Sequence, residues 1–244
     1  MTRRLFVREV RIDWDAAPDS YVRSIPALRR SSTLTFTVPV TFFAGTNGTG
    51  KSTLLEAIAA VYGFNPEGGT RNYRFSTYDD VSDLADAITM VRDLPPTRSG
   101  MFLRAESFFT MATQAAEYGT FGLHEQSHGQ GMMAFIRMFT GPGLYLMDEP
   151  ESALSPQTQL ELLIYIDELT KRGAQFIIAT HSPILLGFPH ATILSFGEDG
   201  IHTIGYEQTE AYRITELFIN HRASLLHRLF REDEGTDGHD ADER

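Results

Sequence analysis

The chain of 244 residues contains no cysteine. It therefore cannot hold a disulfide or a thiolate-ligated zinc ion, and nothing in it indicates an oxidising compartment. Long apolar runs are also missing, because charges interrupt every apolar segment before the roughly 18 to 20 residues that a membrane span requires. Basic residues are few, with 21 Lys and Arg against 32 Asp and Glu, which argues against a broad electrostatic grip on nucleic acid. We expect a cytoplasmic protein with no inserted membrane segment.

The apolar content is sufficient for one sizeable core, since 42% of the residues are hydrophobic and 11% are aromatic. We expect a single domain over residues 1–231, with a helical lobe inserted at about 65–142. Residues 232–244 hold seven Asp and Glu against one Arg. This segment has almost nothing apolar to bury, so it is expected to form a disordered acidic tail.

The apolar patterns predict an α/β fold with a mainly parallel sheet. The run GLYLMD (143–148) has no polar interruption before its acid, which is typical of a strand covered on both faces. With the helix that follows it and the strand FIIAT (176–180), it predicts a βαβ unit. Residues 80–94 fit a helix or a strand equally well. Strands are also predicted over 5–12, 33–45 and 101–109, and a hairpin around 197–200. Helices are predicted over 52–63, after the strand 101–109 as far as about 118, and over 207–231. Residues 65–78 are predicted to form a loop.

A glycine-rich loop, GTNGTGKS, matches G-x-x-x-x-G-K-[ST] between a predicted strand and a predicted helix. Its glycines let successive N–H groups turn toward one anion, and the helix that begins near Lys51 directs its positive dipole end at the same point. We predict that Lys51 reaches the β and γ phosphates of a nucleotide and that Ser52 places its hydroxyl on Mg²⁺. The residues predicted to bind the nucleotide here are Gly45, Thr46, Asn47, Gly48, Thr49, Gly50, Lys51, Ser52 and Thr53.

Two adjacent acids follow the apolar strand in LYLMDEPE. The strand delivers Asp148 at its carboxyl end, the edge where open α/β sheets bind phosphate ligands. Asp148 is the predicted second Mg²⁺ ligand, and Glu149 is the predicted base that orients and deprotonates the attacking water. Together with the glycine-rich loop, these acids predict nucleotide hydrolysis.

Four motifs in this order resemble those of ABC-class ATPases: GTNGTGKST, SHGQG, LYLMDEPESALSP and ATHSP correspond to Walker A, the signature, Walker B with the D-loop, and the switch histidine. More narrowly, the chain resembles small soluble ATPases, often labelled AAA family, whose signature begins Ser-His-Gly and which carry a segment like FLRAESFF. The resemblance implies a P-loop NTPase fold of the ABC-ATPase type, with an N-terminal antiparallel β portion and a small helical lobe.

The resemblance also implies that the signature completes the site of a second copy. Ser127, Gly129 and Gln130 would then hold the phosphates of an ATP bound by the partner, using a second helix N-terminus. His181 resembles the switch histidine that contacts the γ-phosphate. Glu106 stands about where ABC transporters carry a glutamine, so it could approach Mg²⁺, although an ordinary acid at a strand end is an equal alternative. His128 replaces a usual glycine, and SALS replaces Ser-Ala-Leu-Asp.

Three functions remain open from the sequence. The first is a soluble ATPase that dimerises head to tail around two ATP molecules and acts as a switch or clamp on an unidentified macromolecule. The negative net charge of the chain does not favour nucleic acid as that macromolecule. The second is the nucleotide-binding subunit of an ABC transporter, against which the Ser-His-Gly signature and the short region between Lys51 and Ser127 count. The third is a small-molecule kinase, which predicts an acceptor pocket and no signature loop. Tyr21 and Phe36 are both open as a platform for adenine.

Overall fold

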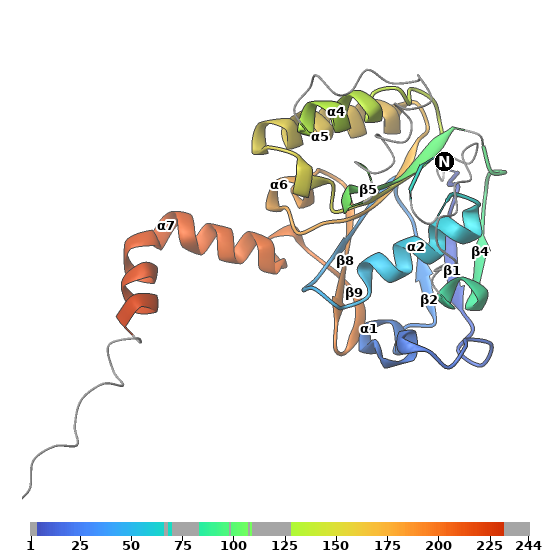
Figure 1. Cartoon of the computed structure of the whole chain (residues 1–244), viewed down its shortest axis with the longest axis horizontal. Coiled ribbons are helices and arrows are strands. Elements are labelled where there is room, and N and C mark those ends of the chain that lie inside the picture. Colours follow the sequence, from blue (N-terminus) through green and yellow to red (C-terminus); the bar gives the residue numbers. More distant parts are fainter. Residues whose placement is uncertain are drawn as a thin grey trace, which may run out of the picture.

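The computed structural model describes residues 4–65, 68–69, 83–97, 99–106, 108 and 128–231. These residues form two β-sheets with helices packed around them, and a C-terminal helix that extends away from the body (Figure 1). Within these ranges, no helix is both long enough and apolar enough to span a membrane.

The central sheet has six strands in the order β5-β6-β7-β3-β8-β9. Its pairs are parallel, apart from the antiparallel β8–β9 hairpin. Every residue of β3, β6 and β7 is buried, which explains why these segments read as unbroken apolar runs. The strands are β3 (Val40–Ala44), β5 (Gly100–Arg104), β6 (Leu144–Asp148), β7 (Gln175–Ala179), β8 (Thr192–Gly197) and β9 (Gly200–Ile204).

Helices cover both faces of the central sheet. Successive strand residues point to opposite faces, and accordingly Phe43 packs in the core that contains α2, whereas Phe42 packs in the core that contains α4 and α5. Figure 1 shows α4 and α5 stacked together on the side away from α2. The helices are α2 (Lys51–Tyr62), α4 (His128–Ile136), α5 (Pro156–Lys171) and the short α6 (Pro183–Leu186).

A three-stranded antiparallel sheet, in the order β2-β1-β4, packs beside the central sheet. The buried side chain of Gln175 ties the central sheet to the segment before β1, because its amide donates to the Val7 carbonyl (2.7 Å) and accepts from the Val7 N–H (2.8 Å). The elements of this region are β1 (Glu9–Ile12), η1 (Tyr21–Ser24), α1 (Pro26–Arg29), β2 (Thr33–Thr35), η2 (Asp83–Ala87) and β4 (Ile88–Val91).

The mainly parallel sheet, the N-terminal antiparallel portion and the βαβ unit formed by β6, α5 and β7 are confirmed. The helix predicted to stop at Gly63 ends there, with Gly63 in the left-handed conformation (φ 97°). The predicted helix to about 118, most of the predicted loop 65–78 and the acidic tail lie outside the described residues. Of the range 65–142 predicted as an inserted helical lobe, the described part contains α4 but also β4 and β5, which are strands of the two sheets.

Three predicted boundaries are wrong, and the segment left open between helix and strand contains one of each kind. The strand 33–45 is two strands in different sheets, since the chain crosses from one sheet to the other over residues 36–39, and Pro39 has no N–H to donate. The strand predicted over 5–12 begins only at Glu9, because the backbone N–H and carbonyl of Val7 are hydrogen-bonded to the Gln175 side chain instead of to a neighbouring strand. The segment 80–94 contains η2 and then β4, and the strand 101–109 ends at Arg104.

The C-terminal helix α7 (Glu210–Arg231) follows the short η5 (Tyr206–Gln208). It begins beside α6, where the rings of Tyr206 and Tyr212 lie 4.8 Å apart. The backbone leaves helical geometry at His221 (φ −130°, ψ 28°), so the helix bends there. Most of α7 lies away from the two sheets (Figure 1).

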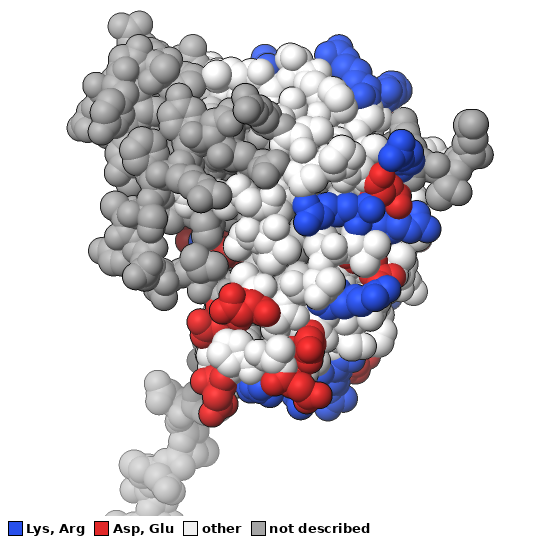
Figure 2. Space-filling view, turned by 90° about the vertical axis from the view of Figure 1, so that its right-hand side faces the viewer, with Lys and Arg blue, Asp and Glu red and all other residues white. Residues whose placement is uncertain are grey.

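The molecular face beside β1 and β4 carries charges of both signs (Figure 2). Two of its arginines are paired with acids, since Arg8 lies 3.4 Å from Asp93 and Arg11 contacts Glu9. Because acidic side chains stand among the basic ones, this face does not form a continuous basic surface of the kind that grips a nucleic-acid backbone.

Candidate active site

The loop between β3 and α2 packs too closely for side chains at two of its glycines. A Cβ atom at Gly45 (φ 140°) would lie 2.6 Å from the Phe196 carbonyl oxygen in β8. A Cβ atom at Gly50 (φ 93°) would lie 2.8 Å from the Ile25 side chain. Both glycines also have left-handed backbone angles that other residues rarely adopt. These two positions explain why the predicted phosphate loop needs glycine.

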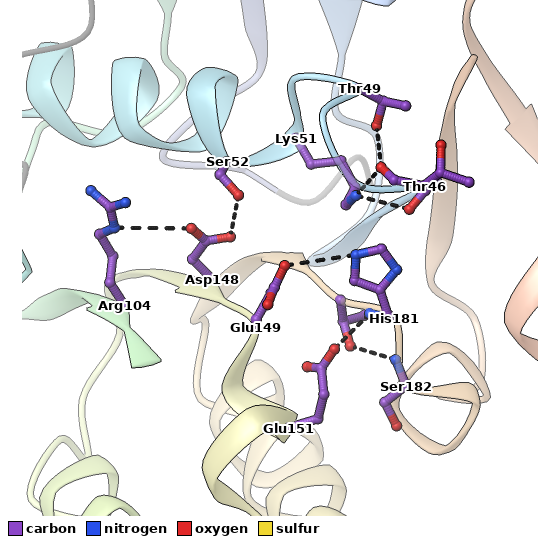
Figure 3. Close-up of polar contacts among 12 residues, drawn as sticks. Thr46, Thr49, Lys51, Ser52, Arg104, Asp148, Glu149, Glu151, His181 and Ser182 are labelled. Atoms are coloured by element: carbon purple, nitrogen blue, oxygen red, sulfur yellow. Dashed lines mark hydrogen bonds and ion pairs between the residues drawn. The ribbon is translucent and has the colours of Figure 1, made fainter. Parts of the chain in front are cut away.

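The ammonium group of Lys51 lies inside this loop. Its Nζ donates to the carbonyl oxygens of Gly45 and Thr46, both at 2.8 Å, and the residue is only 4% exposed (Figure 3). Burial lowers the pKa of Lys51, and the nearby carboxylates of Glu149 and Asp148 partly oppose that shift. A buried cation whose hydrogen bonds go to neutral carbonyls suits a site that receives an anion.

Ser52 and Asp148 meet from different elements, the first turn of α2 and the carboxyl end of β6. The Ser52 hydroxyl donates to Asp148 Oδ1 at 2.9 Å (Figure 3). Burial raises the pKa of Asp148 to about 6, even though the Ser52 hydrogen bond and the Arg104 charge both lower it. A hydroxyl and a carboxylate oxygen are ligands that Mg²⁺ accepts alongside phosphate and water. The two side chains therefore fit the predicted metal position.

The raised pKa of Asp148 predicts a pH-dependent gain in stability for Asp148→Asn. The folded-state pKa of about 6 exceeds the ordinary 3.8, so the folded protein binds more protons between those values and loses stability as the pH rises through this window. The variant cannot titrate. In metal-free buffer at pH 8 its free energy of unfolding should exceed that of the parent by about 3 kcal/mol, and the difference should vanish toward pH 4.

Urea denaturation across this pH range measures the difference. Asp167→Asn, which changes an exposed carboxylate paired with Lys171, is the matched control and should show no comparable gain. A lower stability of Asp148→Asn at pH 8, or a difference that does not change with pH, would contradict the prediction.

Glu149 has a strained backbone. Its φ of 47° and ψ of 51° are left-handed, although it is not glycine. The strained geometry is held by a hydrogen bond from its N–H to the Ala179 carbonyl oxygen (2.9 Å) at the end of β7. Such residues cost of order 1–3 kcal/mol and cluster at functional sites. Here the turn places Glu149 Oε1 3.7 Å from Nε2 of His181 (Figure 3).

His181 is held by neighbours that the sequence did not single out. Its backbone N–H donates to Glu151 Oε1 at 2.6 Å, and the next residue, Ser182, caps the N-terminus of α6. Its Nε2 atom is buried and has no hydrogen-bond partner among the described residues. A buried polar atom of this kind suits a contact with a bound ligand. Because Glu151 approaches His181 only in three dimensions, the motif pattern alone gave no signal for it.

Arg104 is the second residue that sequence reasoning missed. It pairs in register with Asp148 on the neighbouring strand, and its Nε lies 4.0 Å from Asp148 Oδ2. Its guanidinium also contacts Glu56 of α2 at 3.1 Å. A charged residue at the end of the buried strand β5 was the available signal. Arg104 thus links the predicted metal ligand to the helix that follows the phosphate loop.

Glu106 is placed differently from the other predicted metal ligands. Its side chain is 90% exposed, and in the described part of the chain its polar contact is Arg104, at 4.0 Å, rather than Asp148. The adenine platforms also differ. Phe36 is only 1% exposed, so that suggestion is wrong because the core encloses the ring, whereas Tyr21 is 60% exposed and stays open.

Two of the predicted signature residues, Gly129 and Gln130, lie in the first turn of α4, on the face of the central sheet opposite α2. Ser127 is outside the described residues. A Cβ atom at Gly129 would lie 2.8 Å from the Ala153 carbonyl oxygen, so the first turn of α4 packs against the turn that follows Glu149. The apolar side chains of α4 belong to the core opposite α2. Gly129 and Gln130 therefore begin a helix on the face opposite the phosphate loop.

A cavity of about 490 Å³ lies beside the phosphate loop. Gly45 and Thr46 line one part of it, and His181 lines another. The first two turns of α7 also contribute, through Glu210 and Ile214. The start of the projecting helix is therefore a wall of the space next to the candidate site.

Two family models match separate parts of the chain. A model described as AAA domain (AAA_23) matches residues 20–86, which contain the phosphate loop. A second AAA-domain model (AAA_21), whose description names the AbiEii toxin of a type IV TA system as a candidate member, matches residues 130–187, which contain Asp148, Glu149 and His181. Both matched segments bring their motifs to one edge of the parallel sheet. In these two segments the chain is similar to AAA-domain proteins.

Three solved structures are similar to this chain at low sequence identity. CbiO1 from Clostridium perfringens, part of the ABC transporter complex cbiONQ, is 14% identical over 93% of this chain and 100% of its own, with a TM-score of 0.48. The SMC head domain from Thermotoga maritima is 14% identical over 82% and 98%, with a TM-score of 0.46. A nucleotide-free ATP-binding cassette from an ABC transporter is 16% identical over 70% and 83%, with a TM-score of 0.38.

At these identities and scores, the solved structures carry no conclusion about the activity or partners of this chain. No curated protein matches its sequence. The Ser-His-Gly form of the signature stays a prediction, since Ser127 lies outside the described ranges.

Proposed function

We propose that this protein hydrolyses ATP with Mg²⁺ and works as a head-to-tail dimer. The observation that carries the proposal is the convergence of Lys51, Ser52, Asp148, Glu149 and His181 at the carboxyl edge of β3, β6 and β7 (Figure 3). A buried cation, a hydroxyl–carboxylate pair and an acid beside a histidine are the groups that phosphoryl transfer to water requires.

Each of these side chains has one role in the proposed reaction. Lys51 exchanges its contacts with the loop carbonyls for the β and γ phosphates, and the loop N–H groups bind the same oxygens. Ser52 and Asp148 hold Mg²⁺, which neutralises charge on the phosphates when bound. Glu149 accepts a proton from water as the water oxygen bonds to the γ-phosphorus, and the bond from that phosphorus to the bridging oxygen breaks to give ADP and phosphate. His181 donates to a γ-phosphate oxygen.

The dimer follows from the position of the signature. The first turn of α4 packs against the turn after Glu149, on the sheet face opposite α2. We infer that Gly129 and Gln130, together with Ser127 of the same motif, serve the phosphates of a second copy, whose own loop faces them. Two copies then enclose two ATP molecules, and closure or opening of the dimer is the switch that a macromolecular partner reads. On the face shown in Figure 2, the mixed charges do not favour contact with nucleic acid.

Lys51→Ala tests the ATPase proposal directly. Removal of a charged donor aimed at the transferring phosphate should lower phosphate release from Mg-ATP by about 10²-fold or more. Phosphate release is measured with purified protein at saturating ATP. Lys171→Ala, which alters an exposed lysine on α5, is the matched control and should leave the rate unchanged. An equal rate for Lys51→Ala and the parent would remove this loop from catalysis.

A further inference from the structure

Helix α7 (Glu210–Arg231) exposes an unusual amount of apolar surface. Six of the ten exposed large apolar or aromatic side chains in the described chain lie on it, with exposed fractions between 42% and 71%. These six residues are Ile214, Leu217, Phe218, Ile219, Leu229 and Phe230. Contiguous apolar patches beyond a few hundred Å² are rare on soluble monomers and mark interaction sites.

The helix has little support from its own body. Its packing contacts are with η5 and α6 near its start, and Figure 1 shows the remainder projecting away. Helices gain most of their stability from packing an amphipathic face, and a helix left in water is marginal. The exposed face of α7 therefore requires a covering partner.

The charges of α7 indicate what that partner is. Before the bend at His221 the helix carries Glu210 and Glu216 with one arginine, and after it the helix carries Arg222, Arg228 and Arg231 with no acid. One half is thus acidic and the other basic. A second α7 running antiparallel brings opposite charges together, whereas a parallel one brings like charges together. Identical helices that cross a two-fold axis at right angles run antiparallel.

We propose that α7 pairs antiparallel with α7 of a second copy, crossing near Ile219, which is the most exposed of the six residues at 71%. Glu216 and Arg222 are each three positions from Ile219, on opposite sides of the crossing. In the antiparallel pair, Glu216 of one copy therefore faces Arg222 of the other. Leu229 lies beyond the bend at His221, in the half of α7 that pairs with the first half of the partner's helix.

This pairing connects each copy to the nucleotide site of the other. The first turns of α7 line the same cavity as Gly45 and His181. Leu229 and Phe230 of one copy therefore pair with the half of α7 that walls this cavity in its partner. The contact needs no nucleotide, so it holds two copies together when the proposed ATP sandwich is open. It goes beyond the proposed function and does not depend on it.

An amphipathic helix with a basic half could also lie on an anionic membrane. The chain argues against this occupant, because residues 232–244, directly after α7, hold seven acids and one arginine. Their charge would be repelled by anionic lipid. We favour a second copy, because its α7 offers an acidic half to the basic half of this helix and a basic half to the acidic one.

Light scattering in nucleotide-free buffer tests the pairing. The parent protein should dimerise, and Leu229→Glu combined with Phe230→Glu should weaken dimerisation by roughly 100-fold or more, because the partner helix buries both positions. The matched control is Leu160→Glu combined with Ile164→Glu, which alters exposed apolar residues on α5 instead and should dimerise like the parent.

Charge reversal tests whether the two α7 helices run antiparallel. Because the double change is expected to restore the dimer, a loss caused by poor folding of a single variant can be distinguished. Glu216→Arg alone and Arg222→Glu alone should each weaken the nucleotide-free dimer by about tenfold, since each places like charges opposite one another. The two changes in one chain restore opposite charges and should restore the dimer. The residues are six apart on one helix, so they are not neighbours within the same copy.

Several outcomes would overturn the pairing. A parent protein that stays monomeric without nucleotide at its highest soluble concentration excludes it, as does an undiminished dimer in the Leu229/Phe230 variant. A double charge reversal no better than either single change excludes the antiparallel crossing. Capture of a monomeric parent by vesicles of anionic lipid would assign α7 to membranes instead. Failure of the ATP sandwich gives a different result from failure of the α7 pairing. The Ser127→Arg variant should lose the ATP-dependent contact but keep the nucleotide-free dimer.

Discussion

Glu149→Gln is expected to lower steady-state ATP turnover by about 10²–10³-fold while ATP affinity stays within a few-fold of the parent value. The amide keeps the shape of the side chain and the hydrogen bond from its backbone N–H to Ala179. It cannot accept the proton of the attacking water. Phosphate release and titration with a fluorescent ATP analogue measure the two quantities.

The control for this variant is Glu161→Gln, which changes an exposed carboxylate paired with Arg137 and should hydrolyse ATP at the parent rate. Unchanged turnover in Glu149→Gln would remove Glu149 from its role as base. If turnover falls as expected, ATP-bound dimers of this variant persist. An affinity capture with Glu149→Gln and ATP then enriches partners of the closed form, and the same capture without ATP is the baseline.

Ser127→Arg is expected to lower ATP turnover by about 10²-fold or more although the chain still binds ATP through its own phosphate loop. The arginine adds bulk and a misplaced charge at the signature, so the closed sandwich cannot form around the partner's ATP. Turnover and ATP affinity are measured on the same preparation. A parent-like turnover in Ser127→Arg would mean that the signature does not act in catalysis.

The central motifs were predictable because their chemistry is local in sequence. The phosphate loop, Asp148, Glu149 and His181 each follow an apolar strand, and parallel strands bring such positions to one sheet edge. The structure adds why two loop positions are glycine, namely contacts with Phe196 and Ile25 that lie far away in the chain. Roles within the site remain predictions until the variants are measured.

The missed residues share one property: their partners are distant in sequence. Arg104 contacts Glu56, Glu151 contacts His181, and Gln175 binds Val7 across 168 positions. No local pattern encodes such contacts. The single strand predicted over 33–45 failed for the same reason, because pairing with different sheets decides where it breaks. The helix α7 was predicted from its periodicity, but its projection from the body depends on what the remaining chain leaves uncovered.

A heterodimer of two inactive chains tests the shared site most directly. The Lys51→Ala chain and the Ser127→Arg chain are co-expressed with different tags, and the heterodimer is purified through both tags. If each site combines the loop of one copy with the signature of the other, this heterodimer has one site with both defects and one site with neither. The account predicts that this heterodimer recovers about half of the parent ATP turnover. Turnover no higher than that of the two separate variants would contradict a site built from two chains.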